Sequence, residues 1–112
     1  MGVFNGLFPL LPGKEGEFRA FAAEVEARRD EYGAFQARSA VTRETWTMVT
    51  TPTGTVVAVW FEGDVEAAFA DLATSDDDFT VWFRQQIQNV TGLDMAEPDD
   101  APPPELALDW SA

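Results

Sequence analysis

The chain has 112 residues, of which 46% are hydrophobic, and its nine Phe and four Trp predict one packed domain over residues 1–112 rather than a disordered chain. It has no Cys and no His, which excludes disulfides, thiolate catalysis and zinc–thiolate sites, and its net charge of −13 disfavours nucleic acid and anionic membrane surfaces as partners. Because no segment reaches the ~20 apolar residues of a membrane span and no secretory signal is recognisable, we expect a cytoplasmic protein that does not enter membranes.

The first part of the chain predicts a strand followed by a long helix. Residues 3–11 are mostly apolar, and Pro9 indicates a strand end or a bulge because it has no N–H to donate. From residue 14 to about residue 38, aromatic and aliphatic residues recur every three or four positions. This spacing predicts an amphipathic helix with one buried face.

The middle of the chain predicts a hairpin and then two helices. Residues 41–51 and 55–61 are rich in Thr, Val and Trp and flank a turn signal, which favours two antiparallel strands. Asp64 indicates the start of a short helix. Ser75, followed by three Asp, predicts the start of a longer helix that ends at Gly92.

The last part of the chain completes a recognisable order of elements. An acidic, proline-rich connector at 95–104 precedes an alternating segment at 106–110 that predicts a final strand. The β-α-β-β-α-β order predicts an α+β, ferredoxin-like βαββαβ domain with a four-stranded antiparallel sheet and helices on one face. Since the other face needs a cover, we expect a homodimer with two sheets packed face to face in a homodimeric α+β barrel.

Several short motifs carry a resemblance to one superfamily. They are Leu11-Pro12-Gly13-Lys14, Arg28-Arg29-Asp30-Glu31, Thr74-Ser75-Asp76, Phe79-x-x-Trp82-Phe83, and Val90-Thr91-Gly92-Leu93-Asp94 with a terminal Leu108-Asp109-Trp110. In these motifs the chain resembles the dimeric α+β barrel superfamily that includes the antibiotic-biosynthesis monooxygenase-like proteins, and more closely a small uncharacterised bacterial branch of it. The resemblance implies a function among cofactor-independent oxygenases, haem-degrading enzymes, polyketide cyclases, isomerases and proteins with no known reaction. Many active members use a His for proton transfer or haem ligation, and this chain has none, so we expect no haem and no other cofactor.

The predicted hairpin carries three candidate site residues. Counting in steps of two places Glu44 and Trp46 on one face of their strand, and Trp60 lies on the neighbouring strand. Aromatic walls with one or two polar groups are typical of pockets for flat ligands, and the alternative is that both Trp pack in the core or at a dimer interface. In the absence of His and Cys, a general acid–base pair would have to come from Glu44, Glu62, an Asp or Tyr32.

The two predicted long helices carry the other candidates. Arg28 or Arg29 lies at or beside the apolar stripe and could hold a carboxylate or enolate, or could send its head to water or an acid. Tyr32, on the same stripe, and Trp82, on the later helix, could line a cavity or pack in the core. Asn89 could orient a carbonyl group or be solvated. The acids at 76–78 suggest a cation, but they lack the spacing of a calcium loop and suit a helix N-terminus, so we predict no metal site.

Two functions follow from these features. The first is a small-molecule-binding dimer without the usual catalytic residues, whose partners are a second copy of the chain and a small aromatic or polyketide-like ligand. The alternative is a cofactor-independent enzyme, a monooxygenase, cyclase or isomerase, acting on an aromatic or polyketide-like substrate. The sequence leaves open whether the protein is catalytic.

Overall fold

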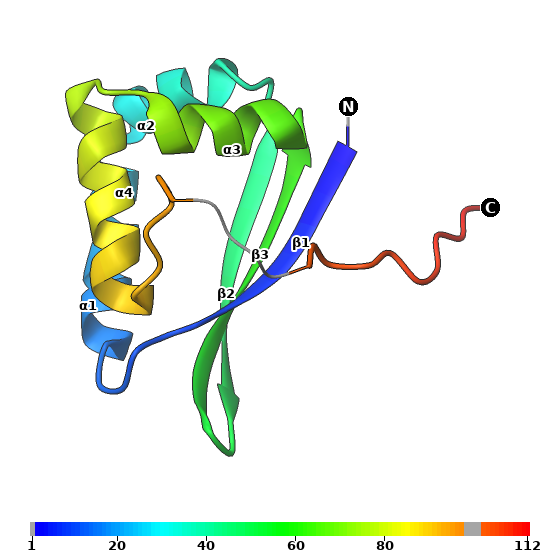
Figure 1. Ribbon diagram of the computed structural model, residues 1–112, viewed down its shortest axis with the longest axis horizontal. Coiled ribbons are helices and arrows are strands. Elements are labelled where there is room, and N and C mark those ends of the chain that lie inside the picture. The colour runs from blue at the N-terminus through cyan, green and yellow to red at the C-terminus, as the bar shows by residue number, and fades with distance from the viewer. Residues whose placement is uncertain (1, 98–101) are drawn as a thin grey trace.

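The computed structural model describes residues 2–97 and 102–112. Within those residues the strands and helices are, in chain order, β1 (Gly2–Pro9), α1 (Glu15–Ala27), α2 (Arg29–Ala37), β2 (Arg43–Thr51), β3 (Gly54–Gly63), α3 (Val65–Thr74) and α4 (Asp78–Thr91). The helices lie on one side of the sheet, and the chain after residue 102 extends on the other side (Figure 1). Among the described residues the fold is therefore two layers, with no helix or strand on the other face of the sheet.

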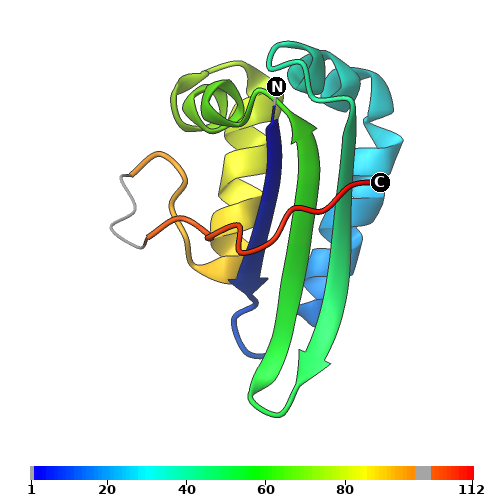
Figure 2. The same ribbon diagram turned by 90° about the vertical axis from the view of Figure 1, so that its right-hand side faces the viewer.

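The antiparallel sheet has the order β1-β3-β2, with β3 in the centre. Trp46 of β2 and Gly6 of β1 both pair with Val59 of β3, so these three residues share one side of the sheet. We call this side, which faces the helices, the core face. The opposite side, which we call the outer face, carries the alternate residues, including Leu7, which pairs with Ala58. Figure 2 looks onto the outer face, with the helices behind it.

The core is dominated by aromatic side chains from the helices. Phe83 of α4 lies with its ring centroid 5.3 Å from those of Phe21 and Phe35 and 5.9 Å from that of Trp46. Such tilted and edge-on pairs add to the free energy of burial. Buried aliphatic residues from β3, α1, α3 and α4 complete the core: Val57, Val25, Leu72 and Val90. These contacts hold the helical layer against the core face.

The predicted four-stranded ferredoxin-like sheet is wrong, and so is a barrel made of two such four-stranded sheets, whereas a homodimer as such stays a prediction. Within the described residues the sheet has three strands, and 106–110 forms none. Three consecutive prolines at 102–104 supply no N–H for strand pairing. The chain then leaves the sheet with Leu106, Leu108 and Trp110 exposed instead of pairing with β1. The predicted connector at 95–104 includes residues 98–101, which lie outside the described residues.

Some of the helix starts and ends predicted from the sequence are confirmed, and others are wrong. Asp64 caps α3 by accepting a hydrogen bond from the Ala67 N–H at 3.1 Å, and Gly92 ends α4 with a φ of 77°, both as predicted. The expected start of α4 at Ser75 is wrong, since Asp77 caps that helix and Ser75 ends α3. The single helix expected from 14 to 38 is interrupted at Arg28, where φ is −98° and ψ is 38°.

Candidate functional site

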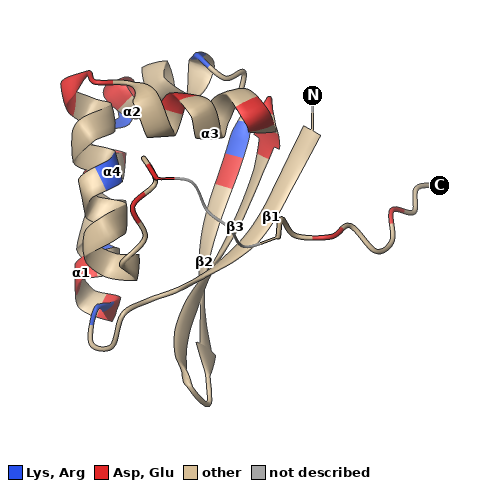
Figure 3. Ribbon diagram, in the orientation of Figure 1, with Lys and Arg blue, Asp and Glu red and all other residues tan. Residues whose placement is uncertain are grey.

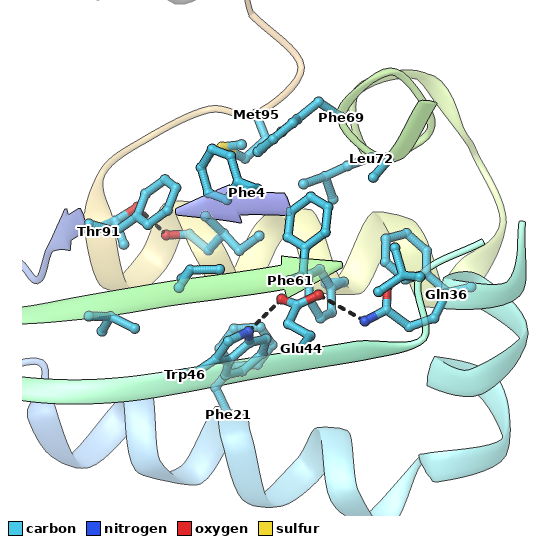
Figure 4. Close-up of a pocket in the computed structure, with 18 of the residues that line it drawn as sticks. Phe4, Phe21, Gln36, Glu44, Trp46, Phe61, Phe69, Leu72, Thr91 and Met95 are labelled. Atoms are coloured by element: carbon cyan, nitrogen blue, oxygen red, sulfur yellow. Dashed lines mark hydrogen bonds between the residues drawn. The ribbon is translucent and has the colours of Figure 1, made fainter. Parts of the chain in front are cut away.

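A cavity of about 100 Å³ lies between the core face and the helices. Rings from all three strands and all four helices line it: Phe4, Phe8, Phe18, Phe21, Phe35, Trp46, Phe61, Phe69 and Phe83. Phe4 of β1, Phe69 of α3 and Met95, which follows α4, lie together at one end of it, and Trp46 and Phe21 lie at the other (Figure 4). An apolar protein cavity of ~150 Å³ can hold benzene, so this smaller cavity has room for one small ring at most.

Two small residues, Gly6 and Ala68, lie next to the rings around the cavity. Gly6 lies on the core face, opposite Val59. A Cβ atom at Gly6 would lie 2.5 Å from Cζ of Phe4 and 3.3 Å from Cε2 of Phe8, so these two rings occupy the space that a side chain there would need. Ala68 of α3 lines the opposite wall. Gly6 thus gives room to two of the rings, and Ala68 puts a small side chain in the wall of the cavity.

One ionisable side chain lies at the cavity, and two neighbours hold it. The Glu44 carboxylate accepts a hydrogen bond from Nε1 of Trp46 at 2.6 Å and another from Nε2 of Gln36 at 2.8 Å (Figure 4). Gln36 also donates from Nε2 to the hydroxyl oxygen of Tyr32 at 2.8 Å. Two helical residues one turn apart and two strand residues therefore form a single hydrogen-bonded group, which fixes the carboxylate in position.

Burial is the main reason that the pKa of Tyr32 is raised far above its ordinary value of 10.0, because an apolar environment disfavours the phenolate. The negative charge of Glu44 raises that pKa further. Tyr32 therefore keeps its proton at any physiological pH. It can act as a hydrogen-bonding group beside the cavity, but not as a base.

Among the sequence-predicted site residues, the structure brings together Tyr32, Glu44 and Trp46. Glu44 and Trp46 line the cavity. Tyr32 is linked to them through Gln36 and packs its ring 5.8 Å from that of Phe83. Gln36 was missed by the sequence reasoning, although its position four residues after Tyr32 places both side chains on the same helix face.

The other candidates lie elsewhere. Trp60 points to the outer face, where it pairs with Asn5 and Thr45. Arg29 is exposed and pairs with Glu26 at 3.2 Å. Asn89, also exposed, accepts from Nζ of Lys14 at 3.3 Å. These three residues do not reach the cavity.

Arg28 and Trp82 meet each other rather than a ligand. The Arg28 guanidinium carbon lies 4.4 Å from the centre of the Trp82 ring and 5.1 Å from that of Phe79, a cation–π arrangement. The same guanidinium donates two hydrogen bonds to the carboxylate of Glu31, at 2.9 and 3.0 Å. This contact ties the junction of α1 and α2 to α4, so its evident role is structural.

The acidic run at 76–78 forms a helix start. Asp77 accepts from the Thr80 backbone N–H at 3.1 Å and pairs with Arg38 at 3.3 Å. Hydrogen bonds and this cation hold its pKa below the ordinary value, although partial burial acts in the opposite direction. Within the described residues, no group of three or more acidic side chains is placed to hold a metal ion.

No family model matches the chain, and neither a curated protein nor a solved structure does. Membership in the dimeric α+β barrel superfamily therefore stays a prediction, as does a cytoplasmic location. In the part of the chain that the structure describes, every helix is too short or too polar to cross a membrane.

Proposed function

We propose that this protein binds a small apolar ring-containing molecule in the cavity between the core face and the helices. The observation that carries the proposal is a space of about 100 Å³ whose walls are aromatic and whose polar lining residues include one carboxylate. Ligand sites of this kind combine apolar walls with a few fixed polar groups. Glu44, held by Trp46 and Gln36, is such a group.

Toluene titration tests the proposal directly, because toluene is a single apolar ring. The four Trp give separate indole N–H signals in a proton–nitrogen correlation spectrum. Trp46 lines the cavity, whereas Trp60 lies on the outer face and Trp110 is 78% exposed. We expect the Trp46 signal to shift and saturate while the signals of Trp60 and Trp110 stay in place. Absence of a saturable Trp46 shift would contradict the proposal.

A pair of variants on α3 separates cavity binding from surface binding. Ala68 lines the cavity and Ala70, on the same helix, is exposed. Ala68→Leu should fill the space and abolish toluene binding, whereas Ala70→Leu should leave it unchanged. Equal binding by both variants would place the ring outside the cavity.

The alternative, a cofactor-independent enzyme for an aromatic or polyketide-like substrate, has one supporting observation, which is the carboxylate at the cavity. Against it, no Lys or Arg is found among the described residues that line the cavity, and such a cation would stabilise a developing enolate or peroxide. Binding without reaction is therefore the better supported function. Oxygen-dependent consumption of a bound ring compound that Glu44→Gln abolishes would shift the assignment to the enzyme.

A second copy of the chain is the partner we propose for the outer face. Among the strand residues on that face only Arg43 and Glu62 are charged, and they pair with each other across β2 and β3. Figure 3 shows charged residues on the helices, the loops and the tail, and few on the strands. A groove on the outer face is lined by Asn5, Leu7, Thr47 and Trp60 and by Pro104 of the tail. An uncharged apolar groove in a chain of net charge −13 is typical of a contact surface.

The tail supports a second copy as the occupant. Leu106, Leu108 and Trp110 are 71%, 80% and 78% exposed, directly after Pro104 leaves the groove. A copy facing this one offers the same groove to those side chains. Light scattering in moderate salt should therefore give the mass of a dimer, and replacing the three residues with Ser should give a monomer. Leu93→Ser, at an exposed site elsewhere, is the control. A wild-type monomer throughout the micromolar range would contradict the dimer.

A further inference from the structure

The polar side chains that line the cavity have their donors engaged, but they can still accept hydrogen bonds. Gln36 uses Nε2 for Glu44 and Tyr32. Trp46 uses its single indole N–H for Glu44. Since an indole has one donor and an amide nitrogen has two, these two side chains direct their donors at partners within the group.

Thr91, the remaining polar residue of the lining, is engaged in the end of α4. Its hydroxyl donates to the Ile87 carbonyl oxygen at 2.7 Å and accepts from the Leu93 N–H at 3.1 Å. A hydroxyl has one proton to donate, and this one is used. Thr91 therefore offers a ligand no donor.

The acceptor side has capacity left. An ionised carboxylate has about four lone-pair positions. Trp46 and Gln36 occupy one on each oxygen of Glu44, and the neighbouring Tyr32 hydroxyl can take a third, which leaves at least one for a ligand. A ligand that donates an O–H or N–H can therefore complete the carboxylate's hydrogen bonding. A ligand carboxylate would meet the negative charge of Glu44 without a cation among the described lining residues, in a chain of net charge −13.

We infer that the ligand is a single aromatic ring that carries a hydrogen-bond donor and no negative charge, such as a phenol or an arylamine, with its donor on Glu44. The inference rests on the proposed function, because it assumes that the cavity binds a ligand. The inference adds the chemical class of that ligand to the proposed function. Size limits the ligand to about one ring, the aromatic walls favour an aromatic one, and the one-sided hydrogen bonding selects the donor.

Three probes with the same ring test the inference by calorimetry: phenol, toluene and benzoate. A hydrogen bond to a charged group is worth enough for phenol to bind about tenfold more tightly than toluene. Benzoate should not bind. If none of the three binds, the proposed function and the inference fall together. If toluene binds as tightly as phenol, or if benzoate binds, the binding function stands and the donor inference is overturned.

A matched pair of variants assigns the effect to one carboxylate. Glu44→Gln keeps the shape of the side chain but removes its charge, so the preference for phenol over toluene should fall by about tenfold. Glu62→Gln alters a carboxylate on the outer face and should keep the preference. An unchanged preference in Glu44→Gln would overturn the inference. Thermal melts establish that each variant is folded, and the wild-type selectivity tests the inference even if Glu44→Gln does not fold.

Discussion

The two faces of the sheet differ in what covers them and in the side chains that they carry. Neighbouring residues such as Gly6 and Leu7, or Glu44 and Thr45, lie on opposite sides. The core face is covered by helices and bears aromatic rings, a cavity and one held carboxylate. The outer face is largely uncharged and carries exposed apolar residues. The period of two in each strand therefore separates the surface that we propose binds a ligand from the surface that we propose contacts a second copy of the chain.

The largest expected contrast is between a core ring and an outer side chain. Phe83 is 4% exposed and touches rings from α1, α2, β2 and α4, whereas Leu7 is 68% exposed. Phe83→Ala should lower the free energy of unfolding by about 3–5 kcal/mol. Leu7→Ala should change it by less than about 0.5 kcal/mol in the monomer. Denaturant titration of both variants measures the difference, and similar losses would mean that the faces are assigned wrongly.

The next contrast uses adjacent residues of β1. Gly6→Ala places a Cβ against the rings of Phe4 and Phe8, which must then shift. Such overpacking costs about 1–3 kcal/mol. Asn5→Ala, on the outer face, is the control and should cost less. If Gly6→Ala were neutral, the two rings would not be confined around the cavity as described.

Two tryptophans on neighbouring strands give a third contrast. Trp46→Phe removes the indole N–H that Glu44 accepts, and the loss of a hydrogen bond to a charged group costs about 1.5–3 kcal/mol. Because Phe retains much of the apolar contact, we expect the lower end of this range. Trp60→Phe removes an indole on the outer face. Its effect on unfolding should be smaller, and an equal effect would argue against the Glu44 contact.

The smallest expected effect is a pH dependence from Tyr32. Its pKa is raised in the folded chain above the ordinary value of 10.0. The unfolded chain therefore releases this proton first as pH rises, so stability is fully present below pH 10 and is lost above it. Linkage gives a loss of about 0.8 kcal/mol by pH ~10.5.

Tyr32→Phe is the control for that titration, because it removes the phenol and leaves every other titratable group in place. The variant should lose less stability than the wild type between pH ~9 and ~10.5. Since Tyr32 is the only Tyr, phenolate absorbance reports it alone. Phenolate formation in the folded chain near pH 10 would show that Tyr32 is not buried beside Glu44.

Local signals in the sequence predicted much of the fold. Thr- and Val-rich segments around a turn predicted the hairpin, and Asp64 and Gly92 predicted helix ends, because each signal acts within a few residues. The expected fourth strand required 106–110 to reach β1 across a proline-rich connector, and alternation alone says nothing about such a distant partner. The break at Arg28 had no signal of its own in the helical spacing.

The candidate site was predictable in part. Stepping by two placed Glu44 and Trp46 on one face, and helical spacing placed Tyr32 on a buried stripe. Only the register shows that Trp46 pairs with Val59 whereas Trp60 pairs with Thr45, which turns the two tryptophans to opposite sides. Gln36 was missed because an amide on a helix has no pattern that distinguishes a buried hydrogen bond from a solvated one.

A crystal structure under xenon pressure tests most directly the claim that an apolar cavity lies between the core face and the helices, since xenon enters such spaces without specific chemistry. We predict a xenon atom in the cavity between the core face and the helices, in contact with its aromatic walls. If the Phe and Trp side chains instead filled the space between the core face and the helices, and no xenon were bound there, the claim of a cavity would be contradicted.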